Sequence, residues 1–303
     1  MPDARAANGN THRSGYVAIL GRPNVGKSTL LNRILERKIA AVTPKPQTTR
    51  RRLLGIKTLP GAQILFFDTP GIHDARDAMN ERMVSRARQS LSDADVALWL
   101  IDASQVLDSA DERIAAWLRP STASVRVGLN KIDRVKKPAL LPLMAEVARM
   151  LPAAEVVPVS AVTGENLDAL LSSVTAALPE GPAYYPEAQI TDETERAIVA
   201  EIVREKAMIE TRDEVPYAIA VTIDAFEERP GRELVVITAT LHVERQSQKR
   251  IVIGTAGSRI KRIGQTARVE IEDLLECRVF LELFVRVQPG WTKQIARLKE
   301  FGV

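Results

Sequence analysis

The chain has 303 residues, 45% of them hydrophobic and 26% charged, which is the composition of a soluble protein with two domains of ordinary size. Its single cysteine, Cys277, excludes an intrachain disulfide and favours a reducing compartment. No apolar run is long enough to cross a membrane, and the N-terminus lacks the hydrophobic centre of a signal peptide. We expect residues 1–14 to form a disordered tail.

The net charge of +4 is mild, but one region is strongly basic. Between Arg245 and Arg268 there are seven basic residues and no acidic residue. A basic cluster on a nearly neutral background favours contact with a polyanion such as nucleic acid. The alternative is a helix face that is merely solvated.

Short apolar runs alternate with helical stretches over residues 15–181. The expected strands are Tyr16–Leu20, Leu53–Lys57, Ala62–Phe67, Val96–Ile101, Val125–Leu129 and Val156–Val159. The helical stretches include Ser28–Leu35, Asn80–Leu91 and Asp168–Ala177. Nearly continuous apolar strands are typical of a sheet buried on both faces, so we predict a three-layer α/β domain with a mostly parallel sheet.

Three prolines and a glycine between Leu178 and Pro186 indicate a linker, which we place at residues 182–190. An α+β domain over residues 191–303 is expected to follow. Its elements in chain order are a helix (Asp192–Ile209), two strands (Tyr217–Phe226 and Leu234–Val243) joined by the turn Glu228–Arg232, two helices (Gln248–Ile253 and Arg259–Glu276), a strand (Val279–Val287) and a closing helix from Trp291.

A glycine loop between the first strand and the first helix matches the pattern G-x-x-x-x-G-K-[ST]. Glycines let backbone N–H groups surround phosphate oxygens, and the helix N-terminus adds partial positive charge. In this pattern Lys27 reaches the β- and γ-phosphates and the Ser28 hydroxyl binds Mg²⁺. The expected phosphate-binding residues are Gly21, Arg22, Pro23, Asn24, Val25, Gly26, Lys27, Ser28 and Thr29.

A second motif, DTPG, follows the strand Ala62–Phe67 and comprises Asp68, Thr69, Pro70 and Gly71. Asp68 can hold Mg²⁺ through water, and the Gly71 amide can bind the γ-phosphate. A switch threonine for Mg²⁺ is expected in Pro46–Arg50, where Thr48 and Thr49 are both candidates and we favour Thr49. The expected Mg²⁺ ligands are therefore Ser28, Thr49 and Asp68.

The motif NKID begins at Asn130, directly after a strand, and the pair Ser160-Ala161 follows the last strand. A carboxylate such as Asp133 accepts both the N1 and 2-amino protons of guanine, which adenine does not offer. The backbone after Ser160 can donate to guanine O6. The expected base-binding residues are Asn130, Lys131, Asp133, Ser160 and Ala161, and the expected ligands are GTP and GDP.

Ile72 stands where Ras-like enzymes have the glutamine that orients the attacking water. We therefore expect slow intrinsic hydrolysis supported by Lys27, Asn24 and Thr49, with no catalytic residue assigned with certainty. Asn24 is similar to the asparagine that binds K⁺ in potassium-activated GTPases, and K⁺ there would stabilise developing charge. The alternative is that Asn24 only bonds the loop backbone. His73 is expected to be a switch side chain, not a general base.

A second glycine loop, Gly254–Gly257, lacks the Gly-Lys-Ser/Thr ending and is not another phosphate loop for a nucleotide. A G-x-x-G turn between two helices is the KH arrangement, which clamps a nucleic-acid backbone. We expect bases to lie in an apolar groove beside the hairpin, with Ile253 and Ile260 as walls. The expected RNA-binding residues are Lys249, Arg250, Ile253, Gly254, Thr255, Ala256, Gly257, Ser258, Arg259, Ile260, Lys261 and Arg262.

The motifs GRPNVGKST, PQTTR, DTPG, NKID, VPVSA, EVPYA and VIGTAGSRIKRIG together resemble the Era GTPases of bacteria and organelles. The resemblance implies a GTPase domain, a type II KH domain and a role in small ribosomal subunit assembly, with binding to the 3′ end of that subunit's RNA. It also implies a location in the cytoplasm and partly at the inner membrane face. We expect a monomer. Thr255 and Ala256 depart from the polar or basic residues usual there. The alternative function is a GTPase with a mainly membrane-associated or cell-cycle regulatory role.

Overall fold

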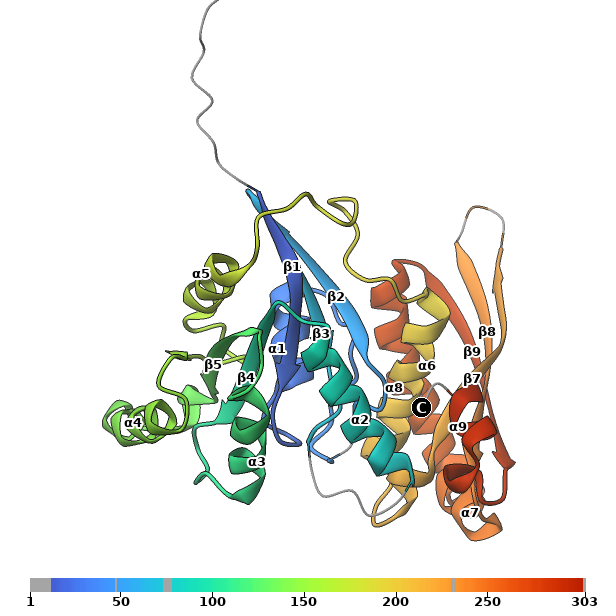
Figure 1. Ribbon diagram of the computed structural model, residues 1–303. Coiled ribbons are helices and arrows are strands. Elements are labelled where there is room, and N and C mark those ends of the chain that lie inside the picture. The colour runs from blue at the N-terminus through green and yellow to red at the C-terminus, as the bar shows by residue number, and fades with distance from the viewer. Residues whose placement is uncertain (1–11, 47, 73–77, 230, 232, 302–303) are drawn as a thin grey trace, which may run out of the picture.

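The structure is a computed structural model that describes residues 12–301 except 47, 73–77, 230 and 232. Its larger sheet has the order β2-β3-β1-β4-β5-β6 (Figure 1). The strands are β1 (Arg13–Leu20), β2 (Leu53–Leu59), β3 (Ala62–Asp68), β4 (Val96–Asp102), β5 (Ser124–Asn130) and β6 (Glu155–Pro158). Only the pairing of β2 with β3 is antiparallel among these neighbours.

Helices cover both faces of this sheet. On one face lie α1 (Lys27–Leu35) and α5 (Leu167–Ala177), and on the other lie α2 (Ala78–Ser92), α3 (Ser109–Leu118) and α4 (Leu140–Met150). Along β1, Val17 and Ile19 join the first of these cores, whereas Ala18 and Leu20 join the second. Successive side chains of a strand point to opposite faces, so a strand buried on both needs an unbroken apolar run. The predicted three-layer α/β domain is confirmed.

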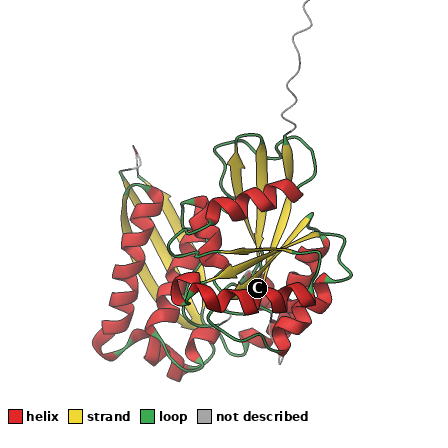
Figure 2. Cartoon of the chain, turned by 90° about the vertical axis from the view of Figure 1, so that its left-hand side faces the viewer, coloured by secondary structure: helices red, strands yellow, loops and turns green. Residues whose placement is uncertain are grey.

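The second domain has the predicted order of elements. They are α6 (Glu195–Glu210), β7 (Ala220–Glu228), β8 (Leu234–Val243), α7 (Gln246–Ile253), α8 (Ser258–Leu275), β9 (Arg278–Val287) and α9 (Ile295–Glu300). Strand β8 is central, antiparallel to β7 and parallel to β9. Helices α6 and α8 lie between the two sheets (Figures 1 and 2).

Helix α6 and strand β7 each begin three residues later than expected. Helix α6 begins at Glu195 rather than Asp192, because the Thr194 hydroxyl accepts the N–H of Ala197 and caps the helix there. Tyr217 lies in a short 3₁₀ helix, Val215–Ala218, before β7 begins. In the expected hairpin turn, Pro230 and Arg232 lie outside the described residues.

The proline-rich segment between the domains is bonded to β3 and to the edge strand β2 of the large sheet. The Gln63 side-chain oxygen accepts the N–H groups of Tyr184 and Tyr185 at 2.7 and 2.9 Å. Farther along, the Ile56 N–H donates to the Ile190 carbonyl at 2.8 Å. This segment therefore follows β3 and β2 on its way to α6. None of the helices in the described part of the chain is both long and apolar enough to span a membrane.

Candidate functional site

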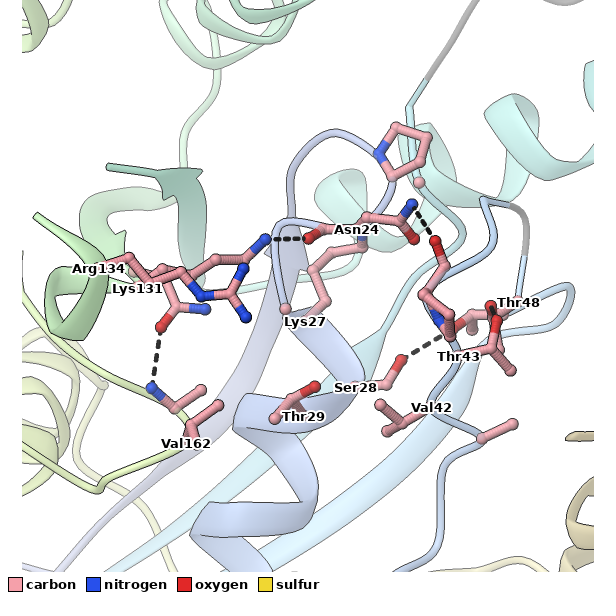
Figure 3. Close-up of a pocket in the computed structure, with 18 of the residues that line it drawn as sticks. Asn24, Lys27, Ser28, Thr29, Val42, Thr43, Thr48, Lys131, Arg134 and Val162 are labelled. Carbon is pink, nitrogen blue, oxygen red and sulfur yellow. Dashed lines mark hydrogen bonds between the residues drawn. The ribbon is translucent and has the colours of Figure 1, made fainter. Parts of the chain in front are cut away.

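A cavity of about 410 Å³ lies at the carboxyl ends of the parallel strands (Figure 3). Its walls come from the loop before α1, the segment 41–49, Gly71, and the loops after β5 and β6. All the predicted nucleotide motifs therefore meet around one hollow. This is the edge at which open α/β sheets bind ligands.

The glycine loop folds around the buried ammonium group of Lys27. Its Nζ donates to the carbonyls of Gly21 and Arg22 at 3.1 and 2.9 Å. Burial lowers the pKa of Lys27 to about 8, and the carboxylate of Asp68 opposes that change. Gly26 has φ of 102°, and a Cβ there would lie 2.4 Å from the Asn130 side chain. The loop thus holds a desolvated cation that an entering phosphate would stabilise.

Anion binding beside Lys27 is expected to be accompanied by proton uptake. Phosphate restores the charged form of Lys27, so the pKa rises on binding, and affinity falls as pH increases above about 8. Calorimetry at pH 8 in buffers of different ionisation enthalpy should detect uptake of about half a proton per nucleotide. At pH 6.5 the uptake should vanish, because the free protein is already protonated. Equal proton exchange at both pH values would contradict this.

Three oxygen-bearing side chains converge beside Lys27. The Ser28 hydroxyl donates to Asp68 Oδ2 at 2.6 Å and lies 2.9 Å from Thr49 Oγ1, which donates to the same carboxylate oxygen at 3.2 Å. The other oxygen, Asp68 Oδ1, is buried and has no hydrogen-bond partner among the described residues, and burial raises the pKa of this carboxyl. Thr48 instead faces Thr43 and the Lys45 carbonyl. The geometry therefore separates Thr49 from Thr48.

This oxygen set fits Mg²⁺. Octahedral Mg²⁺ with ligands at about 2.1 Å places neighbouring oxygens about 3 Å apart, close to the observed separations of Thr49 from Ser28 and Asp68. Such sites combine few protein oxygens with phosphate oxygens and water. Accordingly, the described residues contain no group of three His, Cys, Asp or Glu side chains suited to a metal.

The loops after β5 and β6 form the opposite end of the cavity. Asn130 bridges two loops, since its Nδ2 donates to the Val25 carbonyl at 2.8 Å and its Oδ1 accepts the Ala161 N–H at 2.9 Å. Asp133 Oδ1 accepts the Ser160 hydroxyl at 2.6 Å. This fixes a carboxylate at the rim, where it can accept paired N–H donors.

Lys131 is held by a partner that the motifs do not reveal. Its Nζ contacts Asp102 Oδ2 at 2.6 Å and the Asn24 carbonyl at 2.7 Å. Asp102 ends β4, so its position at the same sheet edge was the available signal. Arg134 and Val162 also line the cavity without having been predicted.

Several predicted residues shape the loop rather than face the hollow with their side chains. The Arg22 guanidinium turns to α3, where it pairs with Asp108 and Asp111 at 2.7 and 2.8 Å. The Thr69 hydroxyl donates to the Ile19 carbonyl at 2.6 Å. Val25 is buried in the core. Within the described chain, the cavity is not lined by Pro70 or by the side chains of Arg22, Val25 and Thr69.

Ile72 is 2% exposed and packs in the core with residues of β1 and α2. We expect Ile72→Gln to give no faster hydrolysis, because the side chain at this position points into the apolar layer. Burying the amide should lower the free energy of unfolding by about 2 kcal/mol, and Ile72→Val should cost about 1 kcal/mol. Urea unfolding and GTP turnover measure both effects. Faster turnover in the glutamine variant would contradict this placement. His73 lies outside the described residues.

The second glycine loop has a backbone that demands its glycines. Gly254 has φ 75° and ψ 173°, and Gly257 has φ 75° and ψ 11°. These are regions that residues with a Cβ avoid. Ala256 adopts φ 49° between them, and both Thr255 and Ala256 are exposed. The turn therefore presents main chain to solvent at the start of α8.

An apolar groove lies between α8 and β9. It is lined by Ile260, Lys261, Gly264, Gln265, Arg268, Phe280, Leu281 and Leu283, and measures about 330 Å³. From the sequence we predicted a groove beside the hairpin of β7 and β8, with Ile253 and Ile260 as its walls. The structure instead gives β9 as the neighbouring strand and leaves Ile253 out of the lining. Topology explains this, because β9 pairs in parallel with β8 as an edge strand of the sheet and lies next to α8.

The predicted basic residues take different directions. Arg259 donates to the Ile251 carbonyl, and Arg262 pairs with Glu210 of α6 at 3.0 Å. Lys249 lines a separate hollow with Asp224. The basic side chains that line the groove are Lys261 and Arg268, of which Arg268 was not among the predicted RNA-binding residues.

The comparisons with known proteins agree with this division. A family model described as 50S ribosome-binding GTPase matches residues 16–131, and a KH domain model matches residues 214–292. GTPase Era of Geobacter metallireducens is 51% identical over 97% of this chain and 98% of its own length. The chain belongs to the Era family of GTPases. GTPase Era of Halothermothrix orenii, more distant, is still 41% identical over 96% of this chain and 99% of its own.

Two solved Era structures match both domains at once. One is Era in complex with MgGDPNP and nucleotides 1506–1542 of 16S ribosomal RNA, and the other is a variant of Aquifex aeolicus Era bound to GDP and AlF₄⁻. Each has a TM-score of 0.92 and 44% identity, covering 96% of this chain and 99% of the other. The Era resemblance, the α/β GTPase domain and the KH domain are therefore confirmed.

Proposed function

We propose that this chain is a GTP-hydrolysing switch that binds the 3′ end of small-subunit ribosomal RNA and acts in assembly of the small ribosomal subunit. The observation that carries the proposal is the full-length similarity to Era solved with both MgGDPNP and a 16S RNA segment. The similarity covers both domains, so it supports the two binding activities together. The family model described as 50S ribosome-binding GTPase matches residues 16–131 alone. These residues lie outside the KH domain.

In this proposal GTP occupies the cavity between the glycine loop and Asp133. Lys27 and the loop amides bind phosphate, Ser28 and Thr49 with Asp68 behind them hold Mg²⁺, and Asp133 selects guanine. Bound Mg²⁺ would neutralise charge that develops on the phosphates. The domain limits at 15–181 and 191–303 are part of the same proposal, as are a cytoplasmic location with peripheral contact at the inner membrane and a monomeric state.

RNA in this proposal lies in the groove between α8 and β9. The main-chain amides of Gly254–Gly257 contact its backbone, and apolar residues such as Ile260 and Leu283 contact its bases. Lys261 and Arg268 supply charge that the turn itself lacks.

A fluorescence titration with an RNA of nucleotides 1506–1542, alongside a GTPase assay, tests the proposal directly. Tight binding that prefers this RNA to its reversed sequence, together with Mg²⁺-dependent release of phosphate from GTP, is the expected result. Equal affinity for both RNAs would remove the proposed RNA target, and loss of turnover would remove the proposed enzyme.

We further propose K⁺ as a second cation beside the phosphates. Asn24 adopts φ 62° and its Nδ2 donates to the Pro44 carbonyl at 2.9 Å, so its Oδ1 remains the acceptor that a cation would use. Hydrolysis is expected to be roughly 100-fold faster in KCl than in NaCl at equal ionic strength, a gain of the size of one added electrostatic contact. Asn24→Ala should remove the difference. Equal rates of the unaltered protein in the two salts would reject the K⁺ site.

A further inference from the structure

The segment that supplies Thr49 to the Mg²⁺ cluster is attached to the second domain at several points. At its start the Val42 N–H donates to Glu205 Oε2 of α6 at 2.7 Å. In its middle the Lys45 ammonium donates to two carbonyls at the end of α6, those of Met208 and Thr211. The segment therefore lies along α6 and cannot move far without breaking these bonds.

Thr49 itself lies between two anchors on that domain. On one side Arg204 Nη2 of α6 donates to the Thr48 carbonyl at 2.5 Å. On the other side the whole side chain of Arg50 enters the second domain. The hydroxyl that meets Ser28 and Asp68 is thus one residue away from each anchor.

Arg50 is a buried cation whose side-chain hydrogen bonds, within the described residues, go to carbonyl groups. Its side chain donates to the carbonyls of Ile219, Pro216 and Tyr217 at 2.7, 3.2 and 2.9 Å. The residue is 4% exposed, and its guanidinium carbon lies 5.9 Å from the centre of the Trp291 ring. Across the described residues it makes no ion pair with a carboxylate, and burial lowers its pKa to about 9. Burying a guanidinium without a carboxylate partner costs free energy. An apolar side chain in the same place would avoid that cost.

The main chain of Arg50 is gripped as well. Arg86 of α2 donates to its carbonyl at 3.2 Å. On the same helix, Met83 packs against Trp291 and Leu298 of the second domain. Helix α2 follows the DTPG motif. Arg50 therefore contacts both this helix and the second domain.

We propose that Arg50 is a positioning residue for GTP hydrolysis: by docking its guanidinium onto the turn 215–219, it holds the Thr49 hydroxyl at the Mg²⁺ site. The second domain then completes the site for a nucleotide that carries a γ-phosphate. This inference rests on the proposed function, because it takes Thr49 as a ligand. We expect GDP, which lacks the γ-phosphate, to need no contact from Thr49, so its affinity should not depend on Arg50.

The test compares Arg50→Met and Arg50→Lys with Arg52→Met. Arg52 is a matched control, because its guanidinium lies over Phe67 and pairs with Asp93 within the first domain. For each variant one measures affinity for GDP and for GDPNP over a range of Mg²⁺ concentrations, together with kcat, KM and the melting temperature.

Arg50→Met is expected to lower GDPNP affinity and kcat about tenfold, a typical coupling between sites, and to leave GDP affinity within about twofold. It should also raise the Mg²⁺ concentration needed for GDPNP binding. Arg50→Lys should fall between this variant and the unaltered protein, because one ammonium cannot reach three carbonyls in the manner of a guanidinium. Arg52→Met should leave the ratio of GDPNP to GDP affinity unchanged.

An unchanged ratio of GDPNP to GDP affinity in Arg50→Lys or Arg50→Met would overturn the proposal. If both affinities fall equally and the melting temperature drops, Arg50 is merely structural. If Arg50→Met does not fold, the ratio in Arg50→Lys decides. Failure of the proposed function is a separate outcome, because it would appear as missing GTP turnover in the unaltered protein.

Discussion

Replacing Asp133 by asparagine is expected to lower GTP affinity by roughly 10⁴-fold, the penalty for a site whose buried hydrogen bonds to the substrate are lost. The Asp133 carboxylate is oriented by the Ser160 hydroxyl at 2.6 Å. It can accept two N–H groups of guanine, whereas an amide in its place presents a donor to one of them. Xanthine carries an oxygen in place of the 2-amino group and should therefore gain affinity in Asp133→Asn.

Titration of fluorescent GDP and xanthosine diphosphate against both proteins measures this exchange. Asp168→Asn, the same chemical change at an exposed position in the first turn of α5, serves as the control and should alter neither affinity. The preference should reverse only in Asp133→Asn. If this variant keeps its preference for guanine, the base contact lies elsewhere.

The first domain could be predicted well from the sequence because its motifs are local. Each is a short stretch whose backbone binds ligand directly after a strand, and burial on both faces makes the strands continuous apolar runs. Helices α3 and α4 were not among the elements predicted by name from the sequence. In α4, Pro142 falls in the first turn, where its missing N–H costs nothing, although a proline in a sequence usually argues against a helix.

The path of residues 36–52 could not be predicted, since this segment is largely irregular and its course is set by contacts with distant residues. Arg204 and Glu205, which hold it, lie more than 150 residues farther along the chain. The separation of Thr49 from Thr48 follows from those contacts. So does the burial of Arg50, because nothing in PQTTR distinguishes a buried arginine from a solvated one. The strand that faces α8 across the groove also depends on the order of the strands in the sheet. The alternating apolar residues of β7 and β8 do not reveal that order.

Reversing the charges of Lys261 and Arg268 to glutamate is expected to weaken binding of the 1506–1542 RNA roughly 100-fold at physiological salt, because two phosphate contacts become repulsive. Both residues line the groove between α8 and β9. Arg262 is a poorer target, since its 3.0 Å pair with Glu210 joins α8 to α6, whereas Arg268 makes only a long pair, 4.0 Å, with Glu272 within α8. GTP turnover should be unchanged, because neither residue contacts the nucleotide cavity.

The salt dependence separates this electrostatic loss from unfolding. The slope of log affinity against log salt should fall by about 0.7 for each single-stranded phosphate contact removed, or about 1.4 in the double variant. Lys136→Glu with Lys137→Glu makes the same change in net charge at exposed positions before α4 and should leave both slope and affinity intact. If RNA binding survives reversal of Lys261 and Arg268, the RNA does not follow this groove. That conclusion holds even if the glycine turn binds part of the RNA.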